Sequence, residues 1–165
     1  MKTMLSVLRL ADLSPFELHS MYKLRVDIFV HEQKTPYAEI DDVDAHQDTR
    51  HVLAWRPDGA HTEVMGVARI FPSDADMVFG RLVVKPEYRG AGLAGKVVRS
   101  ALTYAFENYP GKDITLEAQA KLTDYYADFG FEAEGEQYED TGAPHQKMRL
   151  TSAKLAQYIL KNPVK

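Results

Sequence analysis

A glycine-rich turn is the part of this sequence whose residue types and spacing point most directly to chemistry. It reads Arg89-Gly90-Ala91-Gly92-Leu93-Ala94-Gly95-Lys96, after strand-forming residues at 77–84 and before an apolar segment of helical spacing. Glycines let the backbone approach a ligand closely, and the first amides of a helix point outward, where the helix dipole favours an anion. The segment therefore predicts a phosphate-binding turn between a strand and a helix.

Local charge and periodicity support this interpretation over that of an ordinary strand-to-helix connection. Between residues 81 and 99 five basic side chains stand against the single acid Glu87, although the whole chain has a net charge of −4. One buried helix face is predicted by the apolar residues Leu93, Val97, Val98, Ala101, Leu102, Ala105 and Phe106. Pro110 and Gly111 are expected to end this helix.

Two classes of phosphate-binding turn fit such a segment. Residues 90–96 match the Gly-x-x-x-x-Gly-Lys frame of a P-loop, but Val97 stands where that motif needs a hydroxyl for magnesium. The sequence therefore argues against a P-loop nucleotide binder. The second class is the coenzyme A turn, and here the sequence resembles a known family.

The turn is similar to the Arg/Gln-x-x-Gly-x-Gly/Ala motif of the GNAT superfamily of acyl-CoA N-acyltransferases, with Pro86 and Tyr88 just before it. Further segments resemble its ElaA-like branch, namely 24–33, Pro36-Tyr37 with the acidic run 39–44, 118–120, 126–131, Glu139-Asp140 and Pro144-His145. The resemblance covers roughly residues 5 to 150 in the same order. It is far more specific than the glycine turn alone.

The resemblance implies an α/β (α+β) fold with a mixed, mostly antiparallel central sheet that is splayed at its centre and flanked by helices. We expect one GNAT domain at 1–150 and a short helical extension at 151–165. Acetyl-CoA is the implied co-substrate, without a metal. Its implied binding residues are Leu82, Val83, Val84, Arg89, Gly90, Ala91, Gly92, Leu93, Ala94 and Gln119.

Two residues are candidates for proton transfer. Tyr126 lies four residues before Gly130 and matches the family's tyrosine beside the thioester sulfur, where a neutral phenol can protonate a thiolate. By spacing alone, Tyr125 and Tyr126 could equally be core residues. In many members of the family a glutamate on the central strand acts as the general base, but this chain has Gly80 and Arg81 there. His145 is the alternative base, or else a histidine that only makes hydrogen bonds in a turn.

The acceptor is indicated only by charge. Residues 32–50 contain six acids and two basic residues, and an acidic rim attracts a cationic amine, although such runs are usually solvated loops. The candidate acceptor-binding residues are Glu32, Asp41, Asp44, Arg69 and Arg81. The two arginines could instead pair with Glu32 or Asp44 and hold the pocket shape.

Composition limits the remaining function classes. The chain has 165 residues, 45% of them hydrophobic, which suits one packed domain, and it has no cysteine. We expect a cytoplasmic protein that binds neither membranes nor nucleic acids, because no secretory segment, spanning segment or long basic face is found. The six histidines show no metal-binding spacing. Self-association as a homodimer stays open.

Patterning predicts strands at 4–10, 51–55, 63–71, 77–84, 113–118, 131–138 and 146–150. It predicts helices from Ser14 towards Val30, after the glycine turn, at 121–129 and at 154–160. The expected function is transfer of an acetyl group from acetyl-CoA to a primary amine of a small molecule or peptide, by direct attack in a ternary complex. The alternative is a non-catalytic domain that binds or senses acyl-CoA.

Overall fold

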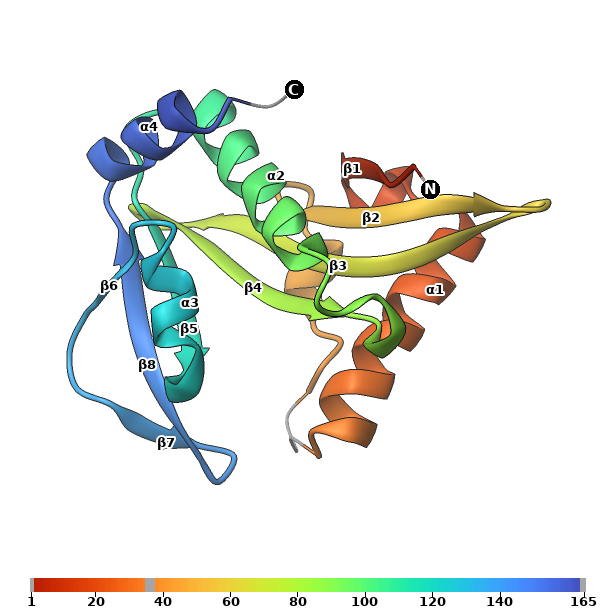
Figure 1. Cartoon of the computed structure of the whole chain (residues 1–165), viewed down its shortest axis with the longest axis horizontal. Coiled ribbons are helices and arrows are strands. Elements are labelled where there is room, and N and C mark those ends of the chain that lie inside the picture. Colours follow the sequence, from red (N-terminus) through yellow and green to blue (C-terminus); the bar gives the residue numbers. More distant parts are fainter. Residues whose placement is uncertain (1, 35–37, 164–165) are drawn as a thin grey trace. The chain divides into compact units, whose positions relative to one another are not determined.

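The computed structural model describes residues 2–34 and 38–163, so Pro36 and Tyr37 of the resemblance lie outside the described residues. The chain has the predicted α/β fold, with a mixed, mostly antiparallel sheet flanked by helices (Figure 1). It forms two compact units, each described here by itself. The first comprises Met1–Phe71 and Arg81–Ala101, and the second Pro72–Gly80 and Leu102–Lys165.

The first unit is built on antiparallel strands. β1 (Met4–Leu8) pairs with β2 (Arg50–Asp58), which pairs in turn with β3 (His61–Ser73). Strands β3 and β4 (Asp76–Val84) both run from one unit into the other. The helical elements are η1 (Leu10–Asp12), α1 (Pro15–Arg25), η2 (Val26–Glu32), η3 (Asp42–Ala45), η4 (Pro86–Tyr88) and the first turns of α2 (Leu93–Asn108).

Helix α1 begins where the sequence predicts. The Ser14 hydroxyl accepts a hydrogen bond from the Glu17 amide at 3.1 Å, and the Glu17 carboxylate accepts one from the Ser14 amide at 2.9 Å. This reciprocal capping box, with Pro15 at the first helical position, satisfies amides that a helix start leaves unpaired. After Arg25 the helix continues as the π-helical segment η2, a wider winding often found at functional sites.

The core of the first unit lies between α1 and the strands β2, β3 and β4; Figure 1 shows where these elements lie. Its buried side chains are Leu13, Met21, Leu24, Ile28, Leu53, Val64, Val67 and Val83. Their spacing on α1 is three or four residues, so one face of this helix and its π-helical continuation is apolar. Burial of that face fixes how the two helical segments present their polar side chains.

The second unit contains β5 (Ile114–Gln119), η5 (Ala120–Leu122), α3 (Thr123–Ala127), β6 (Glu132–Ala133), β7 (Tyr138–Asp140), β8 (Ala143–Leu150) and α4 (Ser152–Lys161). β4 pairs in parallel with β5 at Met77 and Val78, and β8 pairs antiparallel with β5, β6 and β7. The splay between β4 and β5 implied by the resemblance stays a prediction.

One expected element is wrong. The single strand predicted at 131–138 is two short strands, β6 and β7, because the chain turns between them with Gly135 at a φ of 75°. The helix expected at 154–160 is α4, which begins two residues earlier at the Thr151 cap. Among residues 2–34 and 38–163, no helix is both long and apolar enough to span a bilayer.

Candidate active site

The glycine turn has the conformation that a phosphate-binding turn requires. Gly90 and Gly92 adopt φ values of 84° and 80°, in the left-handed region that side chains other than glycine rarely occupy. A Cβ placed on either residue would meet no atom within 4 Å, so this face of the turn is open. Helix α2 begins at the next residue, Leu93, and its first amides lack partners within the helix. The segment can therefore present amides and a helix dipole to an anion.

Arg89, the first residue of the turn, is held on two sides. Its Nε–H donates to the carbonyl oxygen of Val84 at 3.1 Å. Its terminal nitrogens donate to the two carboxylate oxygens of Glu32, each at 3.1 Å, and this hydrogen bonding lowers the pKa of Glu32. The pair joins the last residue of η2 to the start of the glycine turn.

The predicted pantetheine-binding residues form the end of β4. Leu82 is half-buried and Val83 and Val84 are buried. Arg81, just before them, has a φ of 57° inside the strand. A left-handed residue that is not glycine costs of the order of 1–3 kcal/mol, so the surrounding structure must hold it there. Such a residue interrupts regular strand geometry at the point where the resemblance places the splay.

Four of the five acceptor candidates belong to an internal network in the first unit, called here the arginine–carboxylate cluster. Its members are Arg25, Glu39, Asp41, Asp44, Arg69 and Arg81. Asp44 and Arg25 are each 1% exposed. The guanidinium of Arg25 donates to both carboxylate oxygens of Asp44, at 2.8 and 3.0 Å, and to Glu39 Oε1 at 2.8 Å. Three cations and three anions thus balance one another.

The strand arginines complete this cluster. Arg69 donates to Asp41 at 2.7 Å and to Asp44 at 2.9 Å, and Arg81 approaches Glu39 at 3.2 Å and Asp41 at 3.4 Å. Burial acts to raise the pKa of Asp44, but hydrogen bonds and charge from Arg25 and Arg69 hold it below the usual range. Of the two roles open to these arginines by sequence, the geometry favours holding the shape of the protein.

His51 lies beside the cluster and is 1% exposed. Its Nε2–H donates to the Asp44 carbonyl oxygen at 2.9 Å, while Nδ1 is buried and has no hydrogen-bond partner among the described residues. Burial lowers the pKa of His51, and the nearby guanidinium groups of Arg25 and Arg69 lower it further, so the ring is neutral. The ring therefore acts as a neutral packing and donor group.

Tyr126 lies on α3 in the second unit and is 7% exposed. Its ring makes edge contacts with Phe79, Tyr125 and Phe131 at centroid distances of 6.4, 5.3 and 6.0 Å. Burial raises the pKa of the phenol well above its ordinary value, and Tyr125 adds to this effect. Tyr126 is therefore protonated throughout the neutral range.

His145 lies on β8, where it pairs in register with Gln119 of β5 and with Tyr138 of β7. The rings of His145 and Tyr138 stack at a centroid distance of 5.9 Å, and the Tyr138 hydroxyl donates to Glu117. His145 Nδ1 lies 2.9 Å from the Ala143 carbonyl oxygen. A carbonyl only accepts, so Nδ1 carries the proton and Nε2 of the neutral ring keeps its lone pair.

The family assignment follows from comparison of the whole chain with known proteins. A family model for the acetyltransferase (GNAT) domain matches residues 19–152. The chain belongs to the GNAT acetyltransferase family. This confirms the resemblance inferred from the glycine turn and the later motifs.

Relatives of this GNAT protein agree. Protein ElaA of Escherichia coli K12 is 37% identical over 138 residues, which cover 82% of this chain and 88% of ElaA. The crystal structure of an acyl-CoA N-acyltransferase from Pseudomonas aeruginosa has a TM-score of 0.83 at 35% identity, covering 90% of this chain and 99% of that chain. The crystal structure of E. coli ElaA covers the same shares with a TM-score of 0.82 at 34% identity. The ElaA-like resemblance is confirmed.

Three features of the GNAT protein's candidate site escaped prediction: the central position of Arg25, the left-handed Arg81 and the pairing of Glu32 with Arg89. An arginine inside the apolar pattern of α1 is a signal for the first, since a buried charge needs partners. Nothing in the sequence signals a left-handed arginine within a strand. Among residues 2–34 and 38–163, no group of acidic and histidine side chains is arranged to hold a metal ion.

Replacement of Gly92 tests the turn. Gly92→Val should abolish detectable binding of coenzyme A in calorimetric titration, because the side chain strains a φ of 80° and fills the open face. Gly111→Val is the matched control, since Gly111 has a φ of 86° and equally open space but lies after α2. Equal loss of affinity in both variants would assign the effect to strain alone.

His51 predicts a pH dependence of stability. Its folded-state pKa lies below the ordinary value of about 6.5, so the unfolded chain takes up more protons as pH falls through that value. The free energy of unfolding should therefore have its full value above pH 7. It should decrease as the pH is lowered below 7, by at most about 1.4 kcal/mol per pH unit. Urea titrations between pH 7.5 and 5.5 measure this slope. His51→Gln should reduce it, whereas the exposed-site variant His46→Gln should retain it.

Proposed function

We propose that this GNAT protein transfers an acetyl group from acetyl-CoA to a primary amine of a small molecule or peptide by direct attack in a ternary complex. The observation that carries the proposal is the open turn at Gly90 and Gly92 directly before α2. Amides and a helix dipole at one point suit the pyrophosphate of the coenzyme. Backbone groups of Leu82, Val83 and Val84 would bind pantetheine, and Gln119 is a further coenzyme contact.

The proposed acid is Tyr126. When the C–S bond of the thioester breaks, the departing thiolate takes the phenolic proton. The nitrogen of the new amide releases its remaining extra proton to solvent, and the tyrosine regains a proton from solvent. A buried phenol with a raised pKa keeps its proton until a strong base such as a thiolate forms beside it. The aromatic contacts with Phe79, Tyr125 and Phe131 would hold the ring in one orientation.

The proposed base is His145. A cationic amine must lose a proton before its nitrogen can form the new C–N bond, and the lone pair on His145 Nε2 accepts that proton. The hydrogen bond from Nδ1 to Ala143 fixes the required tautomer. Gly80 and Arg81 leave this position of β4 without a carboxylate, which favours the histidine as the base.

The acceptor would be held near carboxylates of the first unit. Asp41 and Arg81 are the more accessible candidates, with side chains 30% and 20% exposed, whereas Asp44 and Arg69 are buried in the arginine–carboxylate cluster. The inner residues would then position the outer ones, and the exposed part of the Asp41 carboxylate would pair with the ammonium group of the acceptor at short range. Glu32 is the fifth candidate and is paired with Arg89.

Tyr126→Phe tests the acid. Wild-type protein should release coenzyme A thiol when acetyl-CoA and a panel of primary amines are supplied. The variant should lower kcat by about 100-fold, within the usual range for a positioned proton donor, and leave the Kd of coenzyme A nearly unchanged. Thiol-release assays measure kcat, and calorimetric titration measures the Kd of coenzyme A.

Tyr125→Phe is the matched control for this test. Within the part of the chain that the structure describes, the buried Tyr125 hydroxyl has no hydrogen-bond partner, so its removal leaves no group unpaired and should preserve kcat. Unchanged turnover in Tyr126→Phe would remove that residue from the mechanism. Coenzyme binding with no thiol release from any amine in the wild type would favour the non-catalytic sensing domain.

His145→Gln tests the base. The variant should lower kcat/KM by about 100-fold at neutral pH, because no side chain then accepts the proton of the amine. His61→Gln, at an exposed position on β3, should leave kcat/KM unchanged. An unchanged kcat/KM in His145→Gln would assign the role of the base to another residue.

A further inference from the structure

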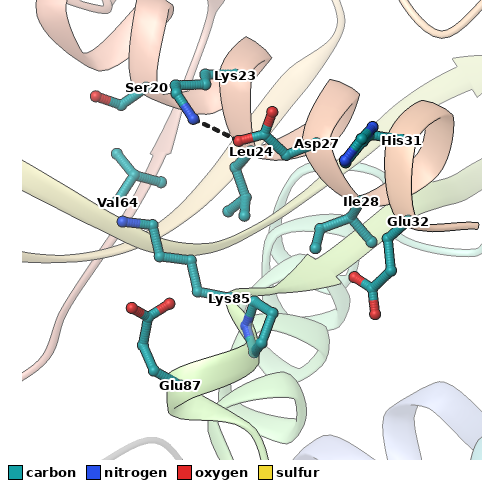
Figure 2. A pocket seen from close by; sticks show the side chains of 11 residues that line it. Ser20, Lys23, Leu24, Asp27, Ile28, His31, Glu32, Val64, Lys85 and Glu87 are labelled. Atoms are coloured by element: carbon teal, nitrogen blue, oxygen red, sulfur yellow. Dashed lines mark hydrogen bonds and ion pairs between the residues drawn. The ribbon is translucent and has the colours of Figure 1, made fainter.

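The first unit contains a cavity whose lining shares only Glu32 with the residues named in the proposed mechanism. It has a volume of about 570 Å³, within the range of small-molecule sites, and lies between α1, η2 and the segment after β4. Buried Leu24, Ile28 and Val64 form its apolar wall. In Figure 2, Leu24 and Ile28 lie between Val64 on the left and Glu32 on the right, and Glu87 lies at the lower left.

The side chains that line this cavity carry an excess of one negative charge, which Arg89 balances from outside the lining through its ion pair with Glu32. Its lining includes three carboxylates, on Asp27, Glu32 and Glu87, against two ammonium groups, on Lys23 and Lys85. Lys23 is paired with Asp27 at 2.5 Å (Figure 2). Lys85 lies 3.9 Å from Glu63, which is outside the cavity. The lining thus suits a ligand that has an apolar body and one positive charge.

Glu32 has a second contact that links the cavity to the coenzyme turn. Its carboxylate lines the cavity and also binds Arg89 through both oxygens at 3.1 Å. Both side chains are 44% exposed, and ion pairs in such positions contribute little to stability. Another cation can therefore replace Arg89 at a small free-energy cost.

The π-helical winding of η2 places these groups together. Asp27, Ile28, His31 and Glu32 all belong to η2 and all line the cavity. The wider winding closes with the Gln33 amide donating to the Ile28 carbonyl at 2.8 Å, five residues back. One short segment therefore supplies both apolar wall and charged rim.

We propose that this cavity binds an organic amine with an apolar body, whose ammonium group pairs with Glu32 in place of Arg89. The amine and Arg89 compete for one carboxylate, so a bound amine frees the guanidinium to face the coenzyme turn. The second part rests on the proposed function of that turn. By linkage, an amine that raises coenzyme affinity must itself bind more tightly when coenzyme is present.

Calorimetric titration of the full chain with hexylamine, and with 1-hexanol as the neutral probe of similar shape, tests the site. Hexylamine should bind and 1-hexanol should bind at least about fivefold more weakly, as expected for loss of one ion pair. Glu32→Gln should weaken hexylamine by a similar factor. Arg89→Gln should strengthen it, because the competing cation is gone. Glu107→Gln, at an exposed position on α2, should change neither value.

Glu32→Gln and Arg89→Gln are expected to change the affinity for hexylamine in opposite directions. This distinguishes the proposal from misfolding, which would weaken binding in both variants. Weaker or unchanged hexylamine binding in Arg89→Gln would overturn the competition, and equal binding of 1-hexanol would overturn the charged site. In wild-type protein, saturating hexylamine should lower the Kd of coenzyme A about fivefold, an effect that Glu32→Gln should abolish. Hexylamine binding without any coenzyme binding would refute the proposed function but leave the cavity's role intact.

Discussion

The buried guanidinium of Arg25 is the constraint on which the first unit depends. A charge removed from water costs several kcal/mol unless partners surround it, and Arg25 meets that requirement with Glu39 and Asp44. Those acids lie 14 and 19 residues later in the chain, so the pairing ties a long acidic segment to the end of α1. Arg69 then brings the same segment to β3. One ionic requirement thereby fixes helix, loop and strand.

The glycine turn depends on a different principle. At Gly90 and Gly92 the chain adopts conformations that only glycine takes easily, and Arg89 closes the gap between the end of β4 and the end of η2. Backbone geometry at Gly90 and Gly92 sets the shape of the turn, whereas the contacts of the Arg89 side chain set the position of the turn. The two elements that contribute most to the proposed site are therefore held by contacts of unequal strength: a buried network and an exposed ion pair.

Local signals in the sequence predicted most elements. Ser14, Pro15 and Glu17 identified the start of α1, and the glycines with their flanking periodicities identified the turn and α2, because each is a short-range pattern. The break between β6 and β7 was missed because Gly135 interrupts an otherwise strand-like run. The roles of Arg25 and Arg69 were not predictable in detail, since ion pairs between residues 14 to 28 positions apart depend on the folded chain. The left-handed Arg81 likewise depends on its surroundings and has no residue-type signal.

The internal balance of the arginine–carboxylate cluster has a kinetic consequence. Residues 32–50 carry a formal charge of −4 in the sequence, yet Arg25, Arg69, Arg81 and Arg89 each bind a carboxylate of that segment. The electric fields of opposite charges this close together cancel at distances beyond the Debye length, which is about 8 Å at physiological salt. The segment therefore exerts almost no long-range pull on a diffusing cation. Encounter rates there should be nearly independent of ionic strength, and selection among amines falls to short-range fit after contact.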